Sequence, residues 1–357
     1  MKLSDACASM SSNIAQKDIS DCEGEYPIFG ASGLIGNVDF YKQEKPYIGI
    51  VKDGAGVGRA YLLPGKSSVI GTMQYILPKS NADITYLYYA IQFMHLEKYY
   101  NGATIPHIYF RDYKHEPLIL PGLPEQQEKA QVLATIDKLI SLHKMQVEMV
   151  DKLVKSRFVE MFGDPVTNPM GWETARLAEL GELNRGVSKH RPRNAPELLN
   201  GPYPLVQTGD VANAGTYIKE YSSTYSEIGL KQSRMWSKGT LCITIAANIA
   251  KTGILTFDAC FPDSVVGFIA GERTNQIYIH HWFSFFQKIL EEQAPQSAQK
   301  NINLQILSNL SVMIPPIDIQ NQFAELVEHA NKSKLAIQQS IDTLQTLKDK
   351  LMQDYFV

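Results

Sequence analysis

The feature that most limits the possible folds of this chain is an internal duplication. Short stretches of the first half recur in the same order in the second: Leu3 matches Leu177, Tyr26-Pro27-Ile28 matches Tyr203-Pro204-Leu205, Leu120-Pro121 matches Ile314-Pro315, Gln126 matches Gln320, and Phe162 matches Phe356. The difference in residue number rises from 177 at Tyr26 to 194 at Leu120 and then stays constant. This is expected if each half is a globular domain, whose loops accept insertions, followed by a helix of fixed length.

Each half ends in a run that predicts one long helix. The run after Pro124 has no Gly or Pro up to Phe162 and is rich in Glu, Gln, Lys, Ala and Leu. Its apolar residues follow heptad spacing once His143 is included: Leu133, Ile136, Ile140, Val147, Val150 and Val154. The run from Gln320 repeats the pattern with Phe323, Leu326, Ala330, Ile337, Leu344, Leu347 and Leu351. Each helix should reach about 50 Å. We expect the two to pair as an antiparallel coiled coil, with His143 as a tolerated polar residue of the seam; separate packing of each helix on its own domain is the alternative.

The two globular halves contain short β-type runs bounded by turn residues. In the first half these are Tyr47 to Val51 and Val69 to Leu77, and in the second Thr240 to Ile245 and Ile254 to Phe257, the last two flanking a turn over residues 248–253. Each half also has a candidate helix, near Ile84 to Tyr99 and near Tyr278 to Glu292. The predicted fold class is α/β (α+β): two mixed α/β domains that alternate with the two long helices. The predicted boundaries are 1–117, 118–163, 164–311 and 312–357, with Gly163-Asp164-Pro165 leading into the second domain.

Composition narrows the class of protein. At 357 residues and 44% hydrophobic content the chain can bury more than one core. It has no apolar stretch of membrane-spanning length, so we expect a cytoplasmic protein without a membrane partner. The net charge of −3 argues against a protein coated in basic residues that binds nucleic acid indiscriminately, although local basic loops remain compatible with it. Cys7, Cys22, Cys242 and Cys260 are far apart and are interpreted as small buried hydrophobic residues.

Motifs that would indicate catalysis or nucleotide binding are incomplete. The glycines at 30, 33 and 36 imitate a dinucleotide-binding turn, but about nine residues separate them from Pro46, with β-type residues inside, and the other repeat lacks them. Gly54, Gly56 and Gly58 lack the Gly-Lys-Ser/Thr ending of a phosphate loop and predict a hairpin turn. Asn168-Pro169 continues Met-Gly, which does not fit an adenine methyltransferase motif. We therefore predict no catalytic residue, no metal site and no cofactor.

The order of domain, long helix, domain and long helix resembles the specificity subunits of type I restriction-modification systems, the HsdS family. The resemblance covers nearly the whole chain. Its motifs are Pro121-Gly-Leu-Pro124-Glu125-Gln126 at the start of the first helix and Lys155-Ser-Arg-Phe-Val-Glu-Met-Phe162-Gly163-Asp164-Pro165 at its end. The second helix departs from the pattern, because Ile319 stands where the first has Glu125.

The resemblance implies a non-catalytic protein. Its two target recognition domains would each read one half of an asymmetric, split site on double-stranded DNA, at a separation set by the helices. It would recruit two methyltransferase subunits and the restriction (translocase) subunits, which carry the enzymatic activities. The alternative is a stand-alone DNA methyltransferase or nuclease with unrecognised motifs.

Residues that contact DNA are expected on loops rich in Lys, Arg, Asn and Gln. The best candidate segment runs from Arg185 through Lys189, His190 and Arg191 to Arg193, although a merely solvated basic loop is the alternative. The corresponding segment of the first half offers Asn13, Gln16 and Lys17. The glycine turns add Lys52 and Arg59 in one half and Lys251 in the other, as candidate phosphate contacts.

Overall fold

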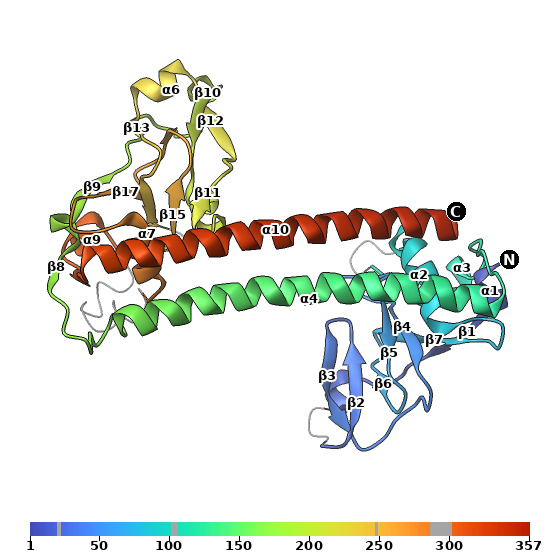
Figure 1. Ribbon diagram of the computed structural model, residues 1–357. Coiled ribbons are helices and arrows are strands. Elements are labelled where there is room, and N and C mark those ends of the chain that lie inside the picture. Colours follow the sequence, from blue (N-terminus) through green and yellow to red (C-terminus); the bar gives the residue numbers. More distant parts are fainter. Residues whose placement is uncertain (20–22, 101–105, 247–248, 286–301) are drawn as a thin grey trace. The chain divides into compact units, whose positions relative to one another are not determined.

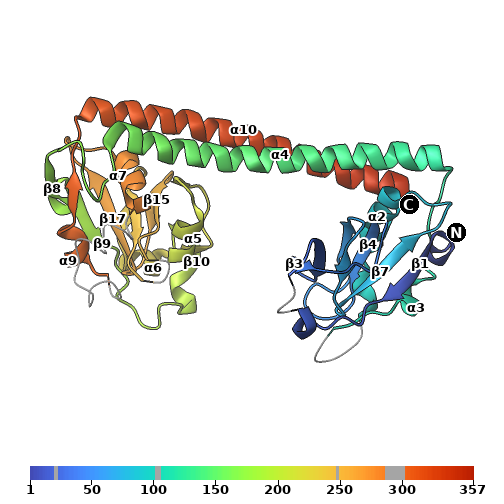
Figure 2. The same ribbon diagram turned by 90° about the horizontal axis from the view of Figure 1, so that it is seen from below.

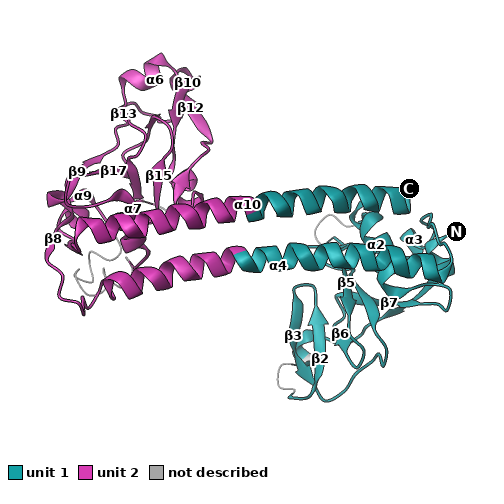
Figure 3. Cartoon of the chain, viewed as in Figure 1, with its two compact units in different colours: residues 1–146, 337–357 teal, residues 147–336 magenta. Residues whose placement is uncertain are grey.

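The chain folds into two compact units, which both contain parts of the long helices. The computed structural model describes residues 1–19, 23–100, 106–246, 249–285 and 302–357. Unit 1 comprises residues 1–146 and 337–357, and unit 2 comprises residues 147–336 (Figure 3). Within the described ranges, no helix is both long and apolar enough to cross a membrane.

Unit 1 is built on a four-stranded antiparallel sheet of order β1-β7-β4-β5 and a small sheet of order β3-β2-β6 (Figure 1). Its elements are α1 (Leu3–Ala6), β1 (Cys7–Ser11), η1 (Gln16–Ile19), β2 (Tyr26–Gly30), β3 (Gly33–Val38), β4 (Tyr47–Val51), β5 (Ala60–Leu63), β6 (Ser68–Val69), β7 (Met73–Pro78), α2 (Ile84–Phe93), η2 (Leu96–Tyr99), α3 (Phe110–Tyr113), the first part of α4 (Leu123–Phe162) and the last part of α10 (Ile317–Phe356). α2 packs on the larger sheet and also lies against the long helices (Figure 2). Its Tyr89 joins a cluster with Leu133 and Met352 of these helices.

Unit 2 repeats this plan with additions. Its elements are the last part of α4, β8 (Thr174–Arg176), η3 (Leu177–Glu179), β9 (Gly181–Arg185), η4 (Pro196–Leu198), β10 (Leu199–Leu205), α5 (Thr208–Asn213), β11 (Tyr217–Ile218), β12 (Ser223–Tyr225), α6 (Glu227–Lys231), β13 (Met235–Trp236), β14 (Leu241–Thr244), β15 (Thr252–Leu255), β16 (Ala259–Cys260), β17 (Val265–Ala270), α7 (Gln276–Trp282), η5 (Phe283–Phe285), α9 (Leu304–Ser308), β18 (Ser311–Met313) and the first part of α10 (Ile317–Phe356). Its sheets have the orders β11-β15-β14-β17-β9, β12-β10-β16-β13 and β18-β8.

The duplication predicted from the sequence is present in the strand pairing. The order β9-β17-β14-β15 reproduces β1-β7-β4-β5, and β11 extends only the second sheet. The parallel pair Ile28 and Ser68 in unit 1 has its counterpart in Leu205 and Cys260 in unit 2. Likewise, the β-bridge between Lys2 and Pro117 in unit 1 has its counterpart in unit 2 in the pairing of Arg176 of β8 with Ser311 of β18. The added elements between β10 and β14 account for the rise in the difference between residue numbers.

The long helices pack antiparallel within each unit. In unit 1, Ile136 and Ile140 of α4 cluster with Ile341 of α10, and Lys348 Nζ lies 2.7 Å from Asp137 Oδ1. In unit 2, Lys334 Nζ lies 2.6 Å from Asp151 Oδ1. The second ion pair is fourteen residues further along α4 and fourteen residues earlier along α10, so two heptads separate the pairs on both helices. This confirms the predicted antiparallel pairing and excludes separate packing.

The predicted seam is largely correct for α4 and partly wrong for α10. Leu133, Ile136, Ile140 and Val154 are buried, and His143 is half-buried with Nδ1 2.8 Å from Gln146 Oε1. On α10 the prediction fails at Leu347, which is 45% exposed. The reason is that the aliphatic stem of Lys348 occupies the seam and carries its amine to Asp137, a substitution that a purely apolar heptad pattern does not detect.

The last aromatic residue of each long helix completes one globular core. Phe162 packs on the Tyr278 ring with 4.9 Å between centroids, and Phe356 packs on Tyr86 at 5.1 Å. The two tyrosines are equivalent as well: the hydroxyl of Tyr86 donates to the Ile119 carbonyl and that of Tyr278 to the Met313 carbonyl. The predicted match of Phe162 with Phe356 is thus a match of structural roles.

The predicted strands and turns agree with the structure except at two places. The second-half run predicted over Ile254 to Phe257 is β15 (Thr252–Leu255), so Thr252 and Gly253 of the predicted turn already belong to the strand. The run from Val69 to Leu77 is not one strand, because Gly71 lies in a turn between β6 and β7. The glycines at 30 and 33 close the β2–β3 hairpin, so a strand and not a helix follows them. The segment with Gly54, Gly56 and Gly58 connects β4 to β5, which confirms the predicted hairpin turn. Cys22, Asn248 in the predicted turn, and residues 286–292 of the predicted helix lie outside the described residues. The remaining cysteines, Cys7, Cys242 and Cys260, are buried and free.

Candidate nucleic-acid interface

The predicted contact residues lie at the same end of the two equivalent sheets. In unit 1, Ser11 at the end of β1 pairs with Gln74, and Val51 at the end of β4 pairs with Met73 at the start of β7. Antiparallel pairing therefore brings the loop after β1, the β4–β5 turn and the turn before β7 to one edge. In unit 2, Arg185 pairs with Val266 and Thr244 pairs with Val265, so the corresponding three loops meet there too.

Three arginines of unit 2 converge on one acidic residue. We name residues 185–194 the basic loop. Arg193 NH2 donates to Asp263 Oδ2 at 2.8 Å, and Arg191 NH2 lies 3.6 Å from the same oxygen. Arg185 Nε donates to the Asp263 main-chain carbonyl at 2.7 Å. All three arginines are exposed, and Asp263 sits in the turn between β16 and β17. The loop is therefore a structured cationic surface.

The backbone of the basic loop is fixed by a second segment, residues 232–233. The main-chain N–H groups of Lys189 and His190 both donate to Gln232 Oε1, at 2.7 and 3.0 Å. The hydroxyl of Ser233 donates to the Val187 carbonyl. His190 Nε2 also lies 3.7 Å from Glu197 Oε1. Lys189 is exposed, and no ion pair involves it among the described residues.

Gly186 lets the basic loop start in a crowded place. A Cβ at this position would lie 2.4 Å from the carbonyl oxygens of both Phe261 and Pro262. The Gly186 N–H donates to the Val265 carbonyl at 2.8 Å, which ties the loop to the strand that follows Asp263. Only a residue without a side chain permits this approach.

Lys251 does not join the basic loop but lines a cavity of about 570 Å³. Lys155, Lys334, His280 and His281 line the same cavity. The Lys155 amine lies over the Phe285 ring, and Lys334 is paired with Asp151. Burial lowers the pKa of His280 to about 4 and that of His281 to about 3, with the charges of His280 and Lys334 adding to the effect on His281. Both imidazoles are therefore neutral at physiological pH.

In unit 1 the predicted contact residues lie together, but they carry less charge. Asn13, Gln16 and Lys17 are exposed, and the Gly71 N–H donates to the Ile14 carbonyl, which ties this segment to the turn before β7. Lys52 is half-buried, with Nζ 3.8 Å from Asp53 Oδ2, and its main-chain N–H donates to the Thr72 carbonyl.

Arg59 differs from the other candidates because it folds back on its own turn. Its Nε and NH2 donate to the carbonyl oxygens of Gly56 and Ala55, each at 3.2 Å. The guanidinium thus stabilises the turn as well as exposing charge to solvent.

The structure also adds residues that the sequence reasoning missed. The main-chain N–H of Ile108 donates to the Lys52 carbonyl, and His107 bridges to Asp53, so the segment 106–111 lies beside the β4–β5 turn. The Arg111 guanidinium lies 4.6 Å from the Tyr109 ring, which is itself 44% exposed. The signal was the alternation of His, Tyr and Arg in 107–111, a pattern suited to stacking on bases.

In unit 2 an arginine, Arg234, likewise lies over an aromatic ring, but that ring, Trp236, is buried and not exposed for stacking. The Arg234 guanidinium lies 3.9 Å from the Trp236 ring and donates to Glu182 Oε1 at 2.7 Å. The Glu182 carboxyl accepts from Arg234 and Asn184, and these bonds lower its pKa.

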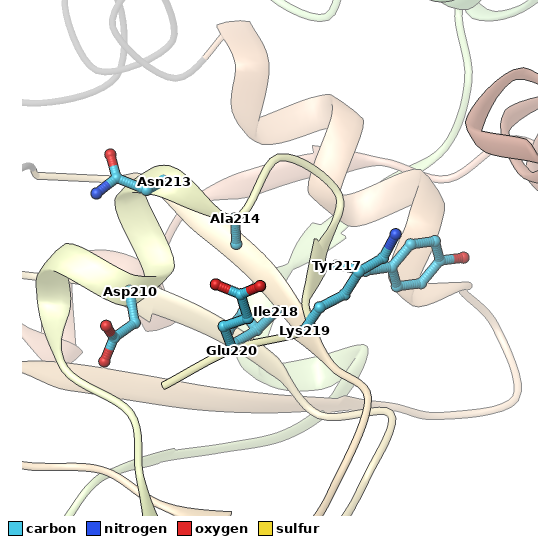
Figure 4. Close-up of a pocket in the computed structure, with 7 residues that line it drawn as sticks. All are labelled: Asp210, Asn213, Ala214, Tyr217, Ile218, Lys219 and Glu220. Atoms are coloured by element: carbon cyan, nitrogen blue, oxygen red, sulfur yellow. The ribbon is translucent and has the colours of Figure 1, made fainter. Parts of the chain in front are cut away.

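A separate pocket beside α5 and β11 has the wrong charge for DNA. It has a volume of about 370 Å³, and Figure 4 shows Asp210 and Asn213 on one side with Tyr217 and Lys219 on the other, and Glu220 between them. The Asp210 carboxylate already accepts from the Gln207 N–H and the Ser222 hydroxyl. Two carboxylates repel a phosphate, so this pocket is poorly suited to hold one. In the part of the chain that the structure describes, no three His, Cys, Asp or Glu side chains are grouped to hold a metal ion.

Comparisons with known proteins agree with one another. The family described as "Type I restriction modification DNA specificity domain" matches residues 1–150 and 169–346. The chain is 23% identical over 303 residues to the type I restriction enzyme MjaIX specificity subunit of Methanocaldococcus jannaschii, covering 78% of this chain and 69% of that protein. It is 22% identical over 369 residues to the MjaVIII specificity subunit of the same organism, covering 90% and 84%. Among solved structures, the S subunit of a type I restriction-modification system from M. genitalium superposes with a TM-score of 0.63 at 14% identity, covering 100% of this chain and 95% of that one.

Proposed function

The chain belongs to the type I restriction-modification DNA specificity family, and from that premise we propose that it reads an asymmetric, two-part DNA site. The observation that carries the proposal is the equivalence of the two sheets together with the difference of their loops. Each unit presents cationic or amide side chains at the same sheet end, on loops that the strands hold in place. Equivalent scaffolds suit the same task, and unequal loops suit different base sequences.

The proposed DNA-contacting loops of the two units differ in chemistry. The basic loop of unit 2 carries arginines, the residue type that recognises guanine through two parallel hydrogen bonds. The corresponding segment of unit 1 offers Asn13 and Gln16, whose amides suit adenine, with Lys17, Lys52 and Arg59 as phosphate contacts. His190 and Lys251 complete the proposed contacts of unit 2. The proposed domain limits are 1–117 and 164–311, with 118–163 and 312–357 as spacer helices.

The proposed role of the spacer helices is to fix the distance between the half-sites. Supporting this are the two ion pairs, Asp137 with Lys348 and Asp151 with Lys334, which keep one heptad register on both helices. A coiled coil resists bending and stretching, so two half-sites moved apart by one base pair would no longer fit the DNA-contacting loops of both units. The number of unread base pairs would then be a property of helix length.

We further propose that the chain is non-catalytic and acts in the cytoplasm by bringing two methyltransferase subunits and the restriction subunits to DNA. A candidate docking surface lies along α4, where large apolar side chains are exposed: Val132, Leu139, Leu142, Met145, Met149 and Leu153. Exposed apolar residues in such a row favour contact with another protein. The alternative function is a stand-alone DNA methyltransferase or nuclease.

Long-read methylation sequencing of cells that carry this chain with its methyltransferase partner tests the proposal. The expected result is one motif with two short specified parts at a fixed separation. Seven residues added to α4 after Lys144 and to α10 before Ile341, midway between the ion-paired residues on each helix, should lengthen the coil by about 10 Å. The unread gap should grow by about three base pairs, at about 3.4 Å each, with both half-sequences unchanged.

Two further experiments separate the parts of the proposal. Replacing residues 1–117 by the first domain of another specificity subunit should change only one half-sequence. The purified chain alone, incubated with S-adenosylmethionine and target DNA, should transfer no methyl group. A continuous palindromic motif, or methyl transfer by the isolated chain, would favour the enzyme alternative.

A further inference from the structure

We infer that Asp263 is a positioning residue for DNA reading by unit 2, which orients the arginines of the basic loop without itself contacting bases. The inference rests on the proposed function, because it assumes that the basic loop faces DNA. It concerns a residue outside the loop, in the turn between β16 and β17.

The contacts of Asp263 divide between its side chain and its main chain. The carboxylate accepts from the Arg193 guanidinium at 2.8 Å and faces that of Arg191 at 3.6 Å. The main-chain carbonyl accepts from Arg185 Nε. A change in the side chain alone therefore releases Arg191 and Arg193 but leaves the Arg185 contact in place.

A carboxylate beside the basic loop would weaken DNA binding unless it orients the arginines. An acid at a DNA-facing surface repels phosphates and lowers the local cationic charge. Base reading by arginine, however, requires the planar guanidinium to approach two acceptors at once, and a flexible arginine loses side-chain entropy when it is fixed. A carboxylate that holds the guanidinium before DNA arrives reduces that loss. Arg191 is held from a second side, because its NH1 donates to the carbonyl oxygens of Ser188 and His190.

The equivalent position of unit 1 has no acid. The pairing of Arg185 with Val266 and of Ser11 with Gln74 aligns the turn before β17 with the turn before β7, so that Asp263 corresponds to Gly71. The Gly71 N–H donates to the Ile14 carbonyl instead. A turn residue that the scaffold required would be expected in both units, whereas the acid occurs only beside the arginines.

Asp263→Asn tests the inference in the complex of the chain with its methyltransferase partner. The control is Glu272→Gln, which removes the same charge from an exposed residue two positions beyond the other end of β17. Binding is measured to a duplex with the motif found by methylation sequencing and to a duplex without it. Asp263→Asn should bind the non-target duplex as tightly as the wild type or a few-fold more tightly, and the target about tenfold more weakly. Glu272→Gln should leave both affinities within about twofold of the wild type.

The methylation motif provides a readout that a purely structural role would not change. In cells with Asp263→Asn, the half-sequence read by unit 2 should relax while the other half-sequence and the gap stay the same. Thermal unfolding shows whether Asp263→Asn is folded. If it is not, Arg193→Lys replaces it as the test: this variant keeps the positive charge but loses the planar guanidinium, and it should relax the same half-sequence. Target binding and a motif identical to those of the control would overturn the inference. A wild-type complex that does not distinguish the two duplexes would instead contradict the proposed function.

Discussion

Gln126 and Gln320 hold the same buried position in the two repeats. Gln126 Nε2 donates to the carbonyl oxygens of Asn81 and Pro121, and its Oε1 accepts from the Asp83 N–H. Gln320 Nε2 donates to the carbonyl oxygens of Arg273 and Pro315, and its Oε1 accepts from the Asn275 N–H. Both side chains are fully buried. Asp83 and Asn275 are the N-caps of α2 and α7, so each glutamine joins the start of a long helix to the start of the helix on the sheet.

The first prediction concerns these amides. Gln126→Ala should lower the free energy of unfolding of unit 1 by about 3 kcal/mol, because it removes three hydrogen bonds of a buried side chain, at about 1 kcal/mol each. Denaturant unfolding and hydrogen exchange of the first turn of α2 measure the effect. Gln131→Ala, at an exposed position of the same helix, is the control and should change stability by less than about 0.5 kcal/mol. Equal effects of the two substitutions would contradict the prediction.

The second prediction is a loss of stability in mild acid. Burial lowers the pKa of His280 to about 4 and of His281 to about 3, while an imidazole in the unfolded chain has a pKa near 6.5. Below about pH 6.5 the unfolded chain therefore binds protons that the folded unit 2 does not. Folding loses up to about 2 kcal/mol per histidine between pH 6.5 and pH 5.

Urea unfolding of unit 2 at several pH values measures this dependence. The Thr252 hydroxyl lies 2.8 Å from His280 Nδ1, and His280→Asn keeps a polar partner for it. This variant should lower the slope of the unfolding free energy against pH by the equivalent of about one proton. The double variant with His281→Asn should remove about two. An unchanged slope in the double variant would show that other groups cause the acid sensitivity.

The third prediction concerns the start of the basic loop. Gly186→Ala places a methyl group against the Phe261 and Pro262 carbonyl oxygens, so the loop must shift, at a cost of about 1–3 kcal/mol. Only the half-sequence read by unit 2 should weaken in methylation sequencing. Gly209→Ala in α5 is the control, since nothing lies within 4 Å of its added Cβ, and it should be neutral or slightly stabilising. Wild-type stability and motif for Gly186→Ala would show that the loop tolerates the shift.

The fourth prediction separates phosphate contacts from base contacts. Lys189→Ala should weaken target and non-target binding alike and lower the slope of log affinity against log salt by about one, because its amine is solvated in the free protein. Arg193→Ala should weaken target binding more than non-target binding. Filter binding across a salt series distinguishes the two. The triple change of Lys189, Arg191 and Arg193 to Ala should affect one half-site; unchanged affinity and slope would mean that the loop is merely solvated.

The sequence predicted the architecture well because a few positions carry it. Gln126, Phe162 and their partners recur at a fixed difference since a helix of fixed length cannot absorb insertions, and the heptads predicted which faces meet. Leu347 was assigned to the seam wrongly because apolar type alone decided the assignment, while Lys348 fills the position with its stem.

The candidate site was predictable only in part. The concentration of cations at 185–193 located the basic loop, because charge density is visible in sequence. The partners of that loop could not be predicted, because Asp263 and Gln232 come from distant segments that only the strand pairing brings beside the loop. The Tyr109 and Arg111 pair was missed for the same reason: its place beside Lys52 depends on the hydrogen bond from Ile108.

The packing of Phe356 on Tyr86 has a consequence for the order of events during synthesis. Unit 2 is one continuous stretch of the chain, residues 147–336, so all of it is synthesised without interruption. Unit 1 begins first but also needs 337–357, which is translated after all of unit 2. Domains generally fold as they emerge. The core of unit 1 can therefore be completed only after all of unit 2 has been synthesised, because until then α2 lacks its contact with Phe356.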